Sequence, residues 1–286
     1  METVTSGYGL IEAPVWDPQR GLLFSDVFGG GVYCVTPEGE VSTVIEHRRG
    51  IGGMVPHEDG GLVVSGRNIA YKPAGGGDSI VLLDRDVDAD RVGFNDITVD
   101  GTGRIYAGSL GSSPVFDDGR EPQAGQLFLV DLDGASRVVA TDVRLTNGLG
   151  FSPDGTRLYH SDSLRNAVMF YEVHPDGSLG DKQVFTETSR GAPDGLVVSK
   201  DGAVWVALAG GGHGVAVYDD AGTEINFIEI PEPMCTSVCF GGDDLHDLYI
   251  VSGSEGSSTE QAGAVHRVRV DVAGLPLGTA NVAIPT

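Results

Sequence analysis

Short runs of apolar residues alternate with turn-forming residues along the whole chain. The runs are rich in β-branched and aromatic side chains, as in Leu22–Phe24, Leu62–Val64 and Leu248–Ile250, and Gly, Asp, Pro and Ser separate them. The chain lacks long stretches with the 3.6-residue apolar spacing of an amphipathic helix. Apolar runs bounded by turn signals are typical of β-strands joined by hairpins. The pattern therefore predicts an all-β protein.

A hairpin signal recurs along the chain at similar intervals. Each copy is a turn that contains Asp, usually with Gly, followed by an apolar strand signal in which one apolar residue serves as the anchor. The anchors are Leu23, Leu62, Ile105, Leu158, Val204 and Leu248, and the steps between them are 39, 43, 53, 46 and 44 residues. A period of roughly 40 to 50 residues is that of a four-stranded propeller blade. Six copies predict a six-bladed β-propeller with four-stranded blades.

Further strand signals follow the hairpins and are expected to supply the outer strands of each blade. Gln126–Val130 and Val215–Tyr218 are two of them. The last run, Ala264–Val268, is expected to join N-terminal residues around Val4, because radial repetition closed in this way protects the sheet edges. No linker interrupts the repeat, so residues 1–286 are expected to form a single domain.

Composition and charge narrow the classes of partner. The 286 residues are 40% hydrophobic, which suffices for a large core, and the 44 glycines are spread between the strand signals as turn residues. The formal net charge of −23 repels nucleic acids and anionic membranes, and no basic cluster stands out against it. No apolar core of signal-peptide length follows Met1, and no apolar run approaches the roughly 20 residues of a membrane span. We expect a cytoplasmic protein that binds neither nucleic acid nor membrane.

The cysteines are expected to be free and buried. Cys34, Cys235 and Cys239 are odd in number, and the last two are spaced C-x-x-x-C without a nearby histidine. A thiolate metal site needs a closer set of ligands.

Polar side chains recur at one phase of the repeat. Asn95 and Asp194 precede their anchors by 10 residues, and Glu12 and Asn147 precede theirs by 11. This position lies where the chain enters the innermost strand of a blade, so the four side chains are expected to meet at one end of the central channel. Turn preferences alone offer another explanation, because Asp and Asn recur in turns without any chemistry.

Several motifs resemble those of one known family, in order and in spacing. They are Ile11–Asp17, Asn95–Gly108, Thr146–Gly155, Pro193–Gly195 and Cys239–Gly242. Together they are similar to the senescence marker protein/gluconolactonase family of regucalcin-like lactonases, and the resemblance covers nearly the whole chain. It implies a six-bladed propeller with one divalent cation at the channel mouth, held by Glu12, Asn147 and Asp194.

The resemblance also implies an activity, a metal-dependent hydrolase that opens a lactone with metal-activated water. Asp194 corresponds to the residue that acts as metal ligand and general base, and Asn95 to one that contacts the substrate. Two carboxylates and an amide oxygen are hard donors that suit Ca²⁺ first, with Mg²⁺, Mn²⁺ or Zn²⁺ as alternatives. Three protein ligands leave positions for water and for a small-molecule lactone or ester.

One departure from the family concerns the substrate. The sugar-lactone members carry Arg two residues before the position of Asn95, where this chain has Gly93. The guanidinium group of that Arg offers several hydrogen-bond donors to a sugar ring. Its loss next to Phe94 is expected to leave room for a less polar lactone, which Phe94 would contact. Alternatively, Arg91 reaches the same place from a shifted backbone.

A long connection follows the strand after Asn95. Residues 111–121 exceed the usual length of a hairpin loop, and such insertions often act as lids. Arg120 and Glu121 within it are candidate substrate-binding residues.

Two other functions stay open at this point. The same metal site could act on another electrophile, such as an organophosphate ester or a natural-product intermediate. The chain could also be a non-catalytic calcium-binding propeller, because a fold alone does not determine a function.

Overall fold

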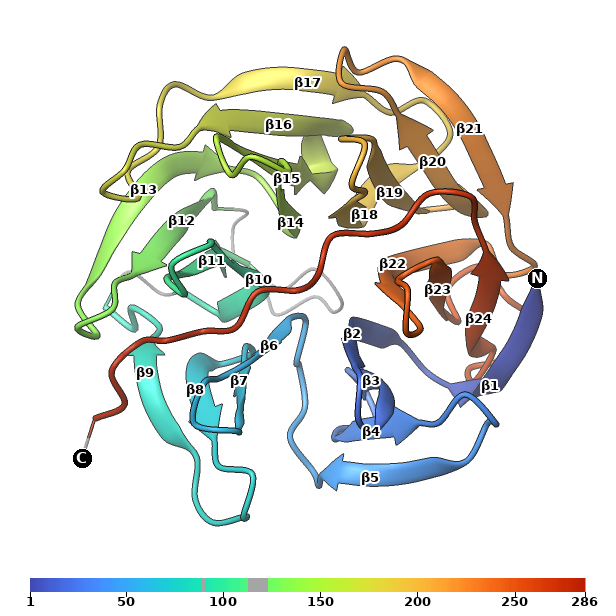
Figure 1. Cartoon of the computed structure of the whole chain (residues 1–286), viewed down its shortest axis with the longest axis horizontal. Helices are drawn as coiled ribbons and strands as arrows, with labels where there is room; N and C mark the ends of the chain where they lie inside the picture. The colour runs from blue at the N-terminus through green and yellow to red at the C-terminus, as the bar shows by residue number, and fades with distance from the viewer. Residues whose placement is uncertain (89–90, 113–122, 286) are drawn as a thin grey trace.

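Six four-stranded antiparallel sheets stand in a ring around a central channel (Figure 1). The computed structural model describes residues 1–88, 91–112 and 123–285. A single-turn 3-10 helix, η1 (Ser163–Arg165), is the one helix within these ranges. The predicted all-β, six-bladed propeller is confirmed. No helix in the described part of the chain is long and apolar enough to cross a membrane.

The strands follow one another from the axis outward in each blade. The first blade has β2 (Ile11–Asp17), β3 (Gly21–Asp26), β4 (Val32–Val35) and β5 (Val41–Ile45); the second has β6 (Met54–Pro56), β7 (Leu62–Val64), β8 (Asn68–Lys72) and β9 (Ile80–Asp84). The third has β10 (Gly93–Val99), β11 (Ile105–Leu110), β12 (Gly125–Val130) and β13 (Ser136–Val143); the fourth has β14 (Thr146–Phe151), β15 (Arg157–Asp162), β16 (Ala167–Glu172) and β17 (Gln183–Glu187). The fifth has β18 (Ala192–Val198), β19 (Val204–Ala209), β20 (Gly214–Tyr218) and β21 (Glu224–Glu229); the sixth has β22 (Met234–Gly241), β23 (Asp247–Gly253), β24 (Gly263–Arg269) and β1 (Glu2–Tyr8).

The two ends of the chain share the sixth blade. β1 pairs antiparallel with β24, with Thr5 opposite Val265 and Ser6 opposite Ala264. The expected pairing of the N-terminal residues with the last apolar run is therefore confirmed, and β1 is the outer strand of the sheet that β22 begins at the axis.

Apolar side chains between neighbouring blades form the core. Ile11 and Leu22 of the first blade pack with Tyr249 and Val251 of the sixth, and similar clusters join the second blade to the third and the fourth to the fifth. Burying a side chain of this size is worth about 1.5 to 3 kcal/mol relative to leaving it exposed. The ring is thus held from blade to blade.

The recurring Asp of the hairpin signal has a structural role. Asp100 Oδ1 accepts a hydrogen bond from the amide of Thr102, and Asp154 Oδ1 accepts one from the amide of Thr156. A carboxylate that binds the backbone two residues ahead stabilises a tight turn. The repeated Asp therefore marks the inner hairpins, as the sequence pattern predicts.

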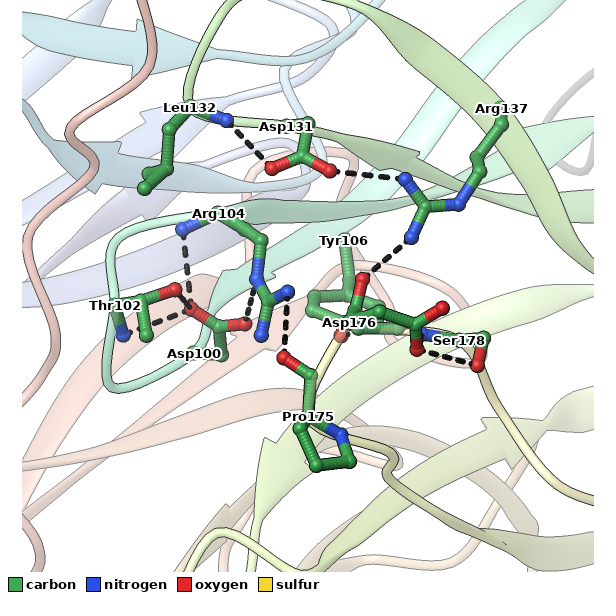
Figure 2. Close-up of polar contacts among 11 residues, drawn as sticks. Asp100, Thr102, Arg104, Tyr106, Asp131, Leu132, Arg137, Pro175, Asp176 and Ser178 are labelled. Carbon is green, nitrogen blue, oxygen red and sulfur yellow. Dashed lines mark hydrogen bonds and ion pairs between the residues drawn. The ribbon is translucent and has the colours of Figure 1, made fainter.

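A polar clamp joins the third blade to the fourth (Figure 2). Arg104 Nε donates to Asp100 Oδ2 at 2.7 Å, with both side chains buried, and Arg104 Nη1 donates to the carbonyl of Pro175 at 3.2 Å. The Tyr106 hydroxyl donates to the carbonyl of Gly177 at 2.9 Å. The hairpin between β10 and β11 and the start of β11 are therefore hydrogen-bonded to the loop between β16 and β17 of the fourth blade.

The C-terminal segment crosses the ring after β24, as the red trace in Figure 1 shows. The amide of Leu275 donates to the carbonyl of Val198 in the fifth blade. The amide of Ala280 donates to the carbonyl of Pro56 in the second blade. His57 Nε2 lies 3.0 Å from the carbonyl oxygen of Val282. We call residues 270–285 the strap, and it lies over the end of the channel where the inner hairpins turn.

Replacing the clamp arginine should weaken the fold. Arg104→Leu should lower the free energy of unfolding by about 3 kcal/mol, because it leaves the buried Asp100 carboxylate without its charged partner. Urea denaturation measures the loss. Arg269→Leu is the control, because its pair with Asp244 is exposed and should contribute much less. Equal losses in the two variants would contradict a stabilising role for the clamp.

Candidate active site at the channel end

The inner strands share an irregularity at the position of the candidate residues. Strand register shifts between Glu12 and Val15 in β2, and corresponding shifts occur in β10, β14, β18 and β22. Asn95, Asn147 and Asp194 lie within these bulges. A β-bulge breaks the alternation of side chains and can direct a side chain away from the sheet face. The shared phase in the sequence therefore corresponds to a shared place in the structure.

The bulge of β2 carries unusual backbone geometry. Ala13, directly after Glu12, has φ of +53°, a left-handed conformation that residues with a Cβ rarely adopt. Strain of this kind persists only where the surrounding structure imposes it, and it is common at functional sites.

Glycines make room for the polar side chains at this end. A Cβ added to Gly52 would lie 1.9 Å from Asn95 Oδ1, and one added to Gly195 would lie 2.0 Å from Ser237 Oγ. Any larger residue would collide with the neighbouring blade. The second blade thus lacks a polar side chain here because the amide of Asn95 occupies the space.

A chain of hydrogen bonds links the third, fourth and fifth blades. Asn95 Nδ2 donates to Asn147 Oδ1 at 2.5 Å and to the carbonyl of Thr146 at 2.9 Å. Asn147 Nδ2 donates to Ser163 Oγ at 2.7 Å, and that hydroxyl donates to the carbonyl of Pro193 at 2.6 Å. The residue next to Asp194 is thereby tied to the Asn147 amide.

Ser163 was missed in the sequence. It lies in η1, outside the repeated strand pattern, and nothing in its local sequence signals contact with Asn147. Only the folded blade brings the two together.

Two buried carboxylates interact electrostatically at this end of the channel. Glu12 is 9% exposed and Asp194 is 5% exposed. Burial raises the pKa of both carboxyls well above their ordinary values, and the Asp194 and Asp96 carboxylates raise the pKa of Glu12 further. Asp194 Oδ1 is buried and has no hydrogen-bond partner among the described residues. An unsatisfied buried oxygen is costly, so this site favours either a proton or a cation beside it.

Asp96 is a third carboxylate that sequence reasoning did not select. It shares the bulge of β10 with Asn95, and burial raises the pKa of its carboxyl from 3.8 to about 7. The pair Asn95–Asp96 is visible in the sequence, but strand alternation would send two adjacent side chains to opposite faces. The bulge removes that alternation.

His160 is a buried residue that contacts the strand carrying Asn147. Its buried Nε2 lies 2.9 Å from Thr146 Oγ1, and burial lowers the pKa of the imidazole to about 3, so the ring is neutral. Thr146 in turn presents the carbonyl that Asn95 binds. His160 thus holds the strand that carries Asn147.

The expected substrate contact of Phe94 is wrong. Phe94 is 3% exposed and packs edge-on against Phe128 in the core between the second and third blades. The hydrophobic effect, together with a backbone hydrogen bond from Phe94 to Gly66, holds the ring inside.

The volume expected at Gly93 is also filled. A Cβ on Gly93 would lie 2.4 Å from the carbonyl oxygen of Gly66 and 3.0 Å from the Cα of Arg67. The backbone of the second blade therefore occupies the space that a missing side chain was expected to vacate. Arg91 Nη1 donates to the carbonyl of Ala124 at 2.5 Å, so its guanidinium is engaged by the backbone.

Two other candidates cannot be placed. Arg120 and Glu121, and most of the predicted lid over residues 111–121, lie outside the described residues.

A large cavity lies elsewhere, at the strap end of the channel. It has a volume of about 840 Å³ and adjoins the strap, with Trp16, Phe151, Phe240, Leu275 and Leu277 among its lining. No carboxyl with a raised pKa lines it, so the candidate site and this cavity are at opposite ends of the channel.

The groups available for a cation are oxygen donors. No three His, Cys, Asp or Glu side chains in the described ranges are grouped closely enough to hold an ion by themselves. Any cation bound between Glu12 and Asp194 would therefore need an amide oxygen such as that of Asn147, or water. Cys34, Cys235 and Cys239 are free and buried, which confirms the prediction for the thiols.

Comparisons with known proteins agree on the family. A family model described as SMP-30/Gluconolactonase/LRE-like region matches residues 10–254. The 6-deoxy-6-sulfogluconolactonase of Pseudomonas putida is 34% identical over 276 residues, which cover 92% of each chain. Pentonolactonase XacC of Haloferax volcanii is 31% identical over 283 residues, covering 93% of this chain and 92% of that relative. The solved structure of a calcium-binding protein, regucalcin, from Agrobacterium tumefaciens has the same fold, with a TM-score of 0.84 at 22% identity over 97% of this chain and 96% of that one.

The raised pKa of Asp96 makes stability depend on pH. Between about pH 4 and pH 7 the folded protein binds more protons at this carboxyl than the unfolded chain does, so its contribution to stability is lost as the pH rises through about 7. In the presence of chelator, we compare the free energy of unfolding of Asp96→Asn with that of the wild type. The difference should rise in favour of the variant by on the order of 1 kcal/mol as the pH increases from 5 to 8. Urea denaturation across that range measures the difference.

The matched control is Asp154→Asn in an exposed turn. The pKa of Asp154 is lowered to about 2, chiefly by the Ser152 hydroxyl and the Thr156 amide, so this variant should show no trend over the same range. A flat difference for Asp96→Asn would mean that Asp96 is ionised throughout.

Proposed function

Because the chain belongs to the SMP-30/gluconolactonase/LRE-like family, we propose that it is a hydrolase that opens a small-molecule lactone at the channel end. The observation that carries the proposal is the buried Oδ1 of Asp194, which has no partner within the described ranges, near a second buried carboxylate, Glu12. The relatives from Pseudomonas putida and Haloferax volcanii are lactonases by name, and the region matched by the family model includes Glu12, Asn95, Asn147 and Asp194.

The donor set supports a divalent cation. Glu12, Asn147 and Asp194 offer two carboxylates and one amide oxygen, which suit Ca²⁺ first and Mg²⁺, Mn²⁺ or Zn²⁺ as alternatives. When bound, such an ion would polarise the lactone carbonyl and lower the pKa of a water molecule. Its charge would also offset the cost of keeping two carboxylates ionised in a buried place.

The protein side chains would orient the reactants and move the proton. Asp194 is proposed as the general base, because burial makes its carboxylate more basic than an exposed one and Oδ1 is free to accept a proton from water. Asn95 is proposed to contact the substrate. Its Nδ2 is occupied by two hydrogen bonds, so its Oδ1 would accept a hydrogen bond from a substrate hydroxyl.

Removing the cation should abolish turnover and lower stability. We expect one equivalent of Ca²⁺ to bind chelated protein and to raise the melting temperature, because the ligands meet only in the closed ring. Calorimetry measures the binding of Ca²⁺. Proton release measures the hydrolysis of aldonolactones, aryl lactones, aliphatic lactones and an aryl phosphotriester, with and without chelator. Ca²⁺ binding without hydrolysis of any compound would indicate a binding protein, and absence of a saturable site would contradict the ligand set.

The base can be separated from the metal ligand. Asp194→Asn keeps an oxygen donor but removes the proton acceptor, so Ca²⁺ should still bind, more weakly, while kcat for the best lactone falls roughly 100-fold or more. Asp154→Asn at the other end of the channel is the control and should retain full activity. Unchanged turnover in Asp194→Asn at saturating Ca²⁺ would assign the proton transfer to another group.

A further inference from the structure

The guanidinium groups of three exposed arginines have no hydrogen bond, ion pair or aromatic partner in the part of the chain that the structure describes. They are Arg49, Arg67 and Arg144. The chain contains 41 acidic residues and only 18 lysines and arginines, so acidic partners are abundant. Other arginines take them, as Arg190 does with Glu224. The free guanidinium groups are therefore a distinctive feature of this surface.

All three lie at the end of the channel that holds the candidate site. Arg49 comes just before Gly52, and Arg144 comes just before Asn147. Arg67 is in the turn between β7 and β8; the preceding turn, between β6 and β7, is at the strap end, so the chain has returned to the site end by Arg67.

Arg67 is the arginine whose backbone is held against the site. The carbonyl of Gly66 accepts a hydrogen bond from the amide of Phe94 at 2.7 Å. The Cα of Arg67 lies 3.0 Å from the place where Gly93 would carry a Cβ. Asn95, two residues along the same strand, donates to Asn147. The backbone of Arg67 therefore lies at the edge of the site, against the strand that carries the side chain proposed to contact the substrate.

Arg49 carries a second guanidinium group on the same side of the ring. The carbonyl oxygen of Arg49 lies 3.5 Å from the place where Gly66 would carry a Cβ, so Arg49 and Arg67 belong to adjacent backbone segments. Positive charge is thus concentrated at one edge of a site whose interior holds the carboxylates Glu12 and Asp194.

We propose that Arg67 binds an anionic substituent of the substrate, a carboxylate, sulfonate or phosphate group that does not take part in ring opening. The proposal rests on the proposed lactonase function. A chain with a formal charge of −23 repels anions, so an anionic substrate needs a local cation, whereas a neutral one does not. The planar guanidinium can donate two parallel hydrogen bonds to such a group.

The test compares two substrates that differ only in the anion. D-glucono-1,5-lactone and its 6-phosphate are assayed with wild type, Arg67→Gln and Arg67→Lys. We expect Arg67→Gln to lower kcat/KM for the phosphorylated lactone roughly 10- to 100-fold, mainly through KM, and to change the neutral lactone less than about threefold. Arg67→Lys should restore part of the loss, because it keeps the charge but not the fork.

Lys200→Gln is the matched control. Lys200 is exposed, its amine has no partner in the described residues, and it lies at the strap end, so the variant removes the same charge far from the site. It should leave the ratio of the two kcat/KM values unchanged. If Lys200→Gln and Arg67→Gln changed the ratio of the two kcat/KM values equally, net charge alone would explain the effect and the proposal would be overturned. An unchanged ratio in Arg67→Gln would overturn it as well.

Binding separates this proposal from the proposed function. Calorimetry with 6-phosphogluconate and with gluconate needs no turnover. Tighter binding of the phosphorylated compound, lost in Arg67→Gln, supports the anion site even if no lactone is hydrolysed. Equal binding of the two compounds by the wild type overturns it even if lactones are hydrolysed.

Discussion

Closure of the ring is the constraint on which the rest of this structure depends. Each blade packs its apolar side chains against two neighbours, and the sixth blade has its fourth strand only because β1 pairs with β24 at the far end of the chain. A closed ring fixes the distance of every inner strand from the axis. Glu12 and Asp194 therefore cannot move apart to relieve their repulsion, and the site favours a proton or a cation beside them.

The bulges of the inner strands bring polar side chains together at one end of the closed ring. Regular strands would point alternate side chains toward the neighbouring blades, where apolar residues are required. A bulge at one height in five blades lets polar side chains leave this pattern together. Burying these groups costs stability, and the interblade packing and the clamp at Arg104 compensate for it elsewhere in the ring.

The repeat made the fold predictable from the sequence, because turn residues and apolar runs recur at the blade period. The same phase located Glu12, Asn95, Asn147 and Asp194 at one channel end, and the family resemblance is confirmed by the matched region. Their roles remain proposals.

The failures have a common physical origin. Asp96 and Ser163 depend on a bulge and on a one-turn helix, which no periodic pattern encodes. Phe94 and Gly93 were misplaced because the neighbouring blade, which fills the space beside them, is invisible from their own strand.

The strap gives the molecule a definite orientation for any attachment. Its hydrogen bonds to Val198 and Pro56 hold it over the hairpin end, and its described part extends to the rim of the ring (Figure 1). A fused domain or a solid support joined to the C-terminus would therefore sit on the side away from Glu12 and Asp194. Immobilised molecules would present the candidate site to the solution, all facing the same way.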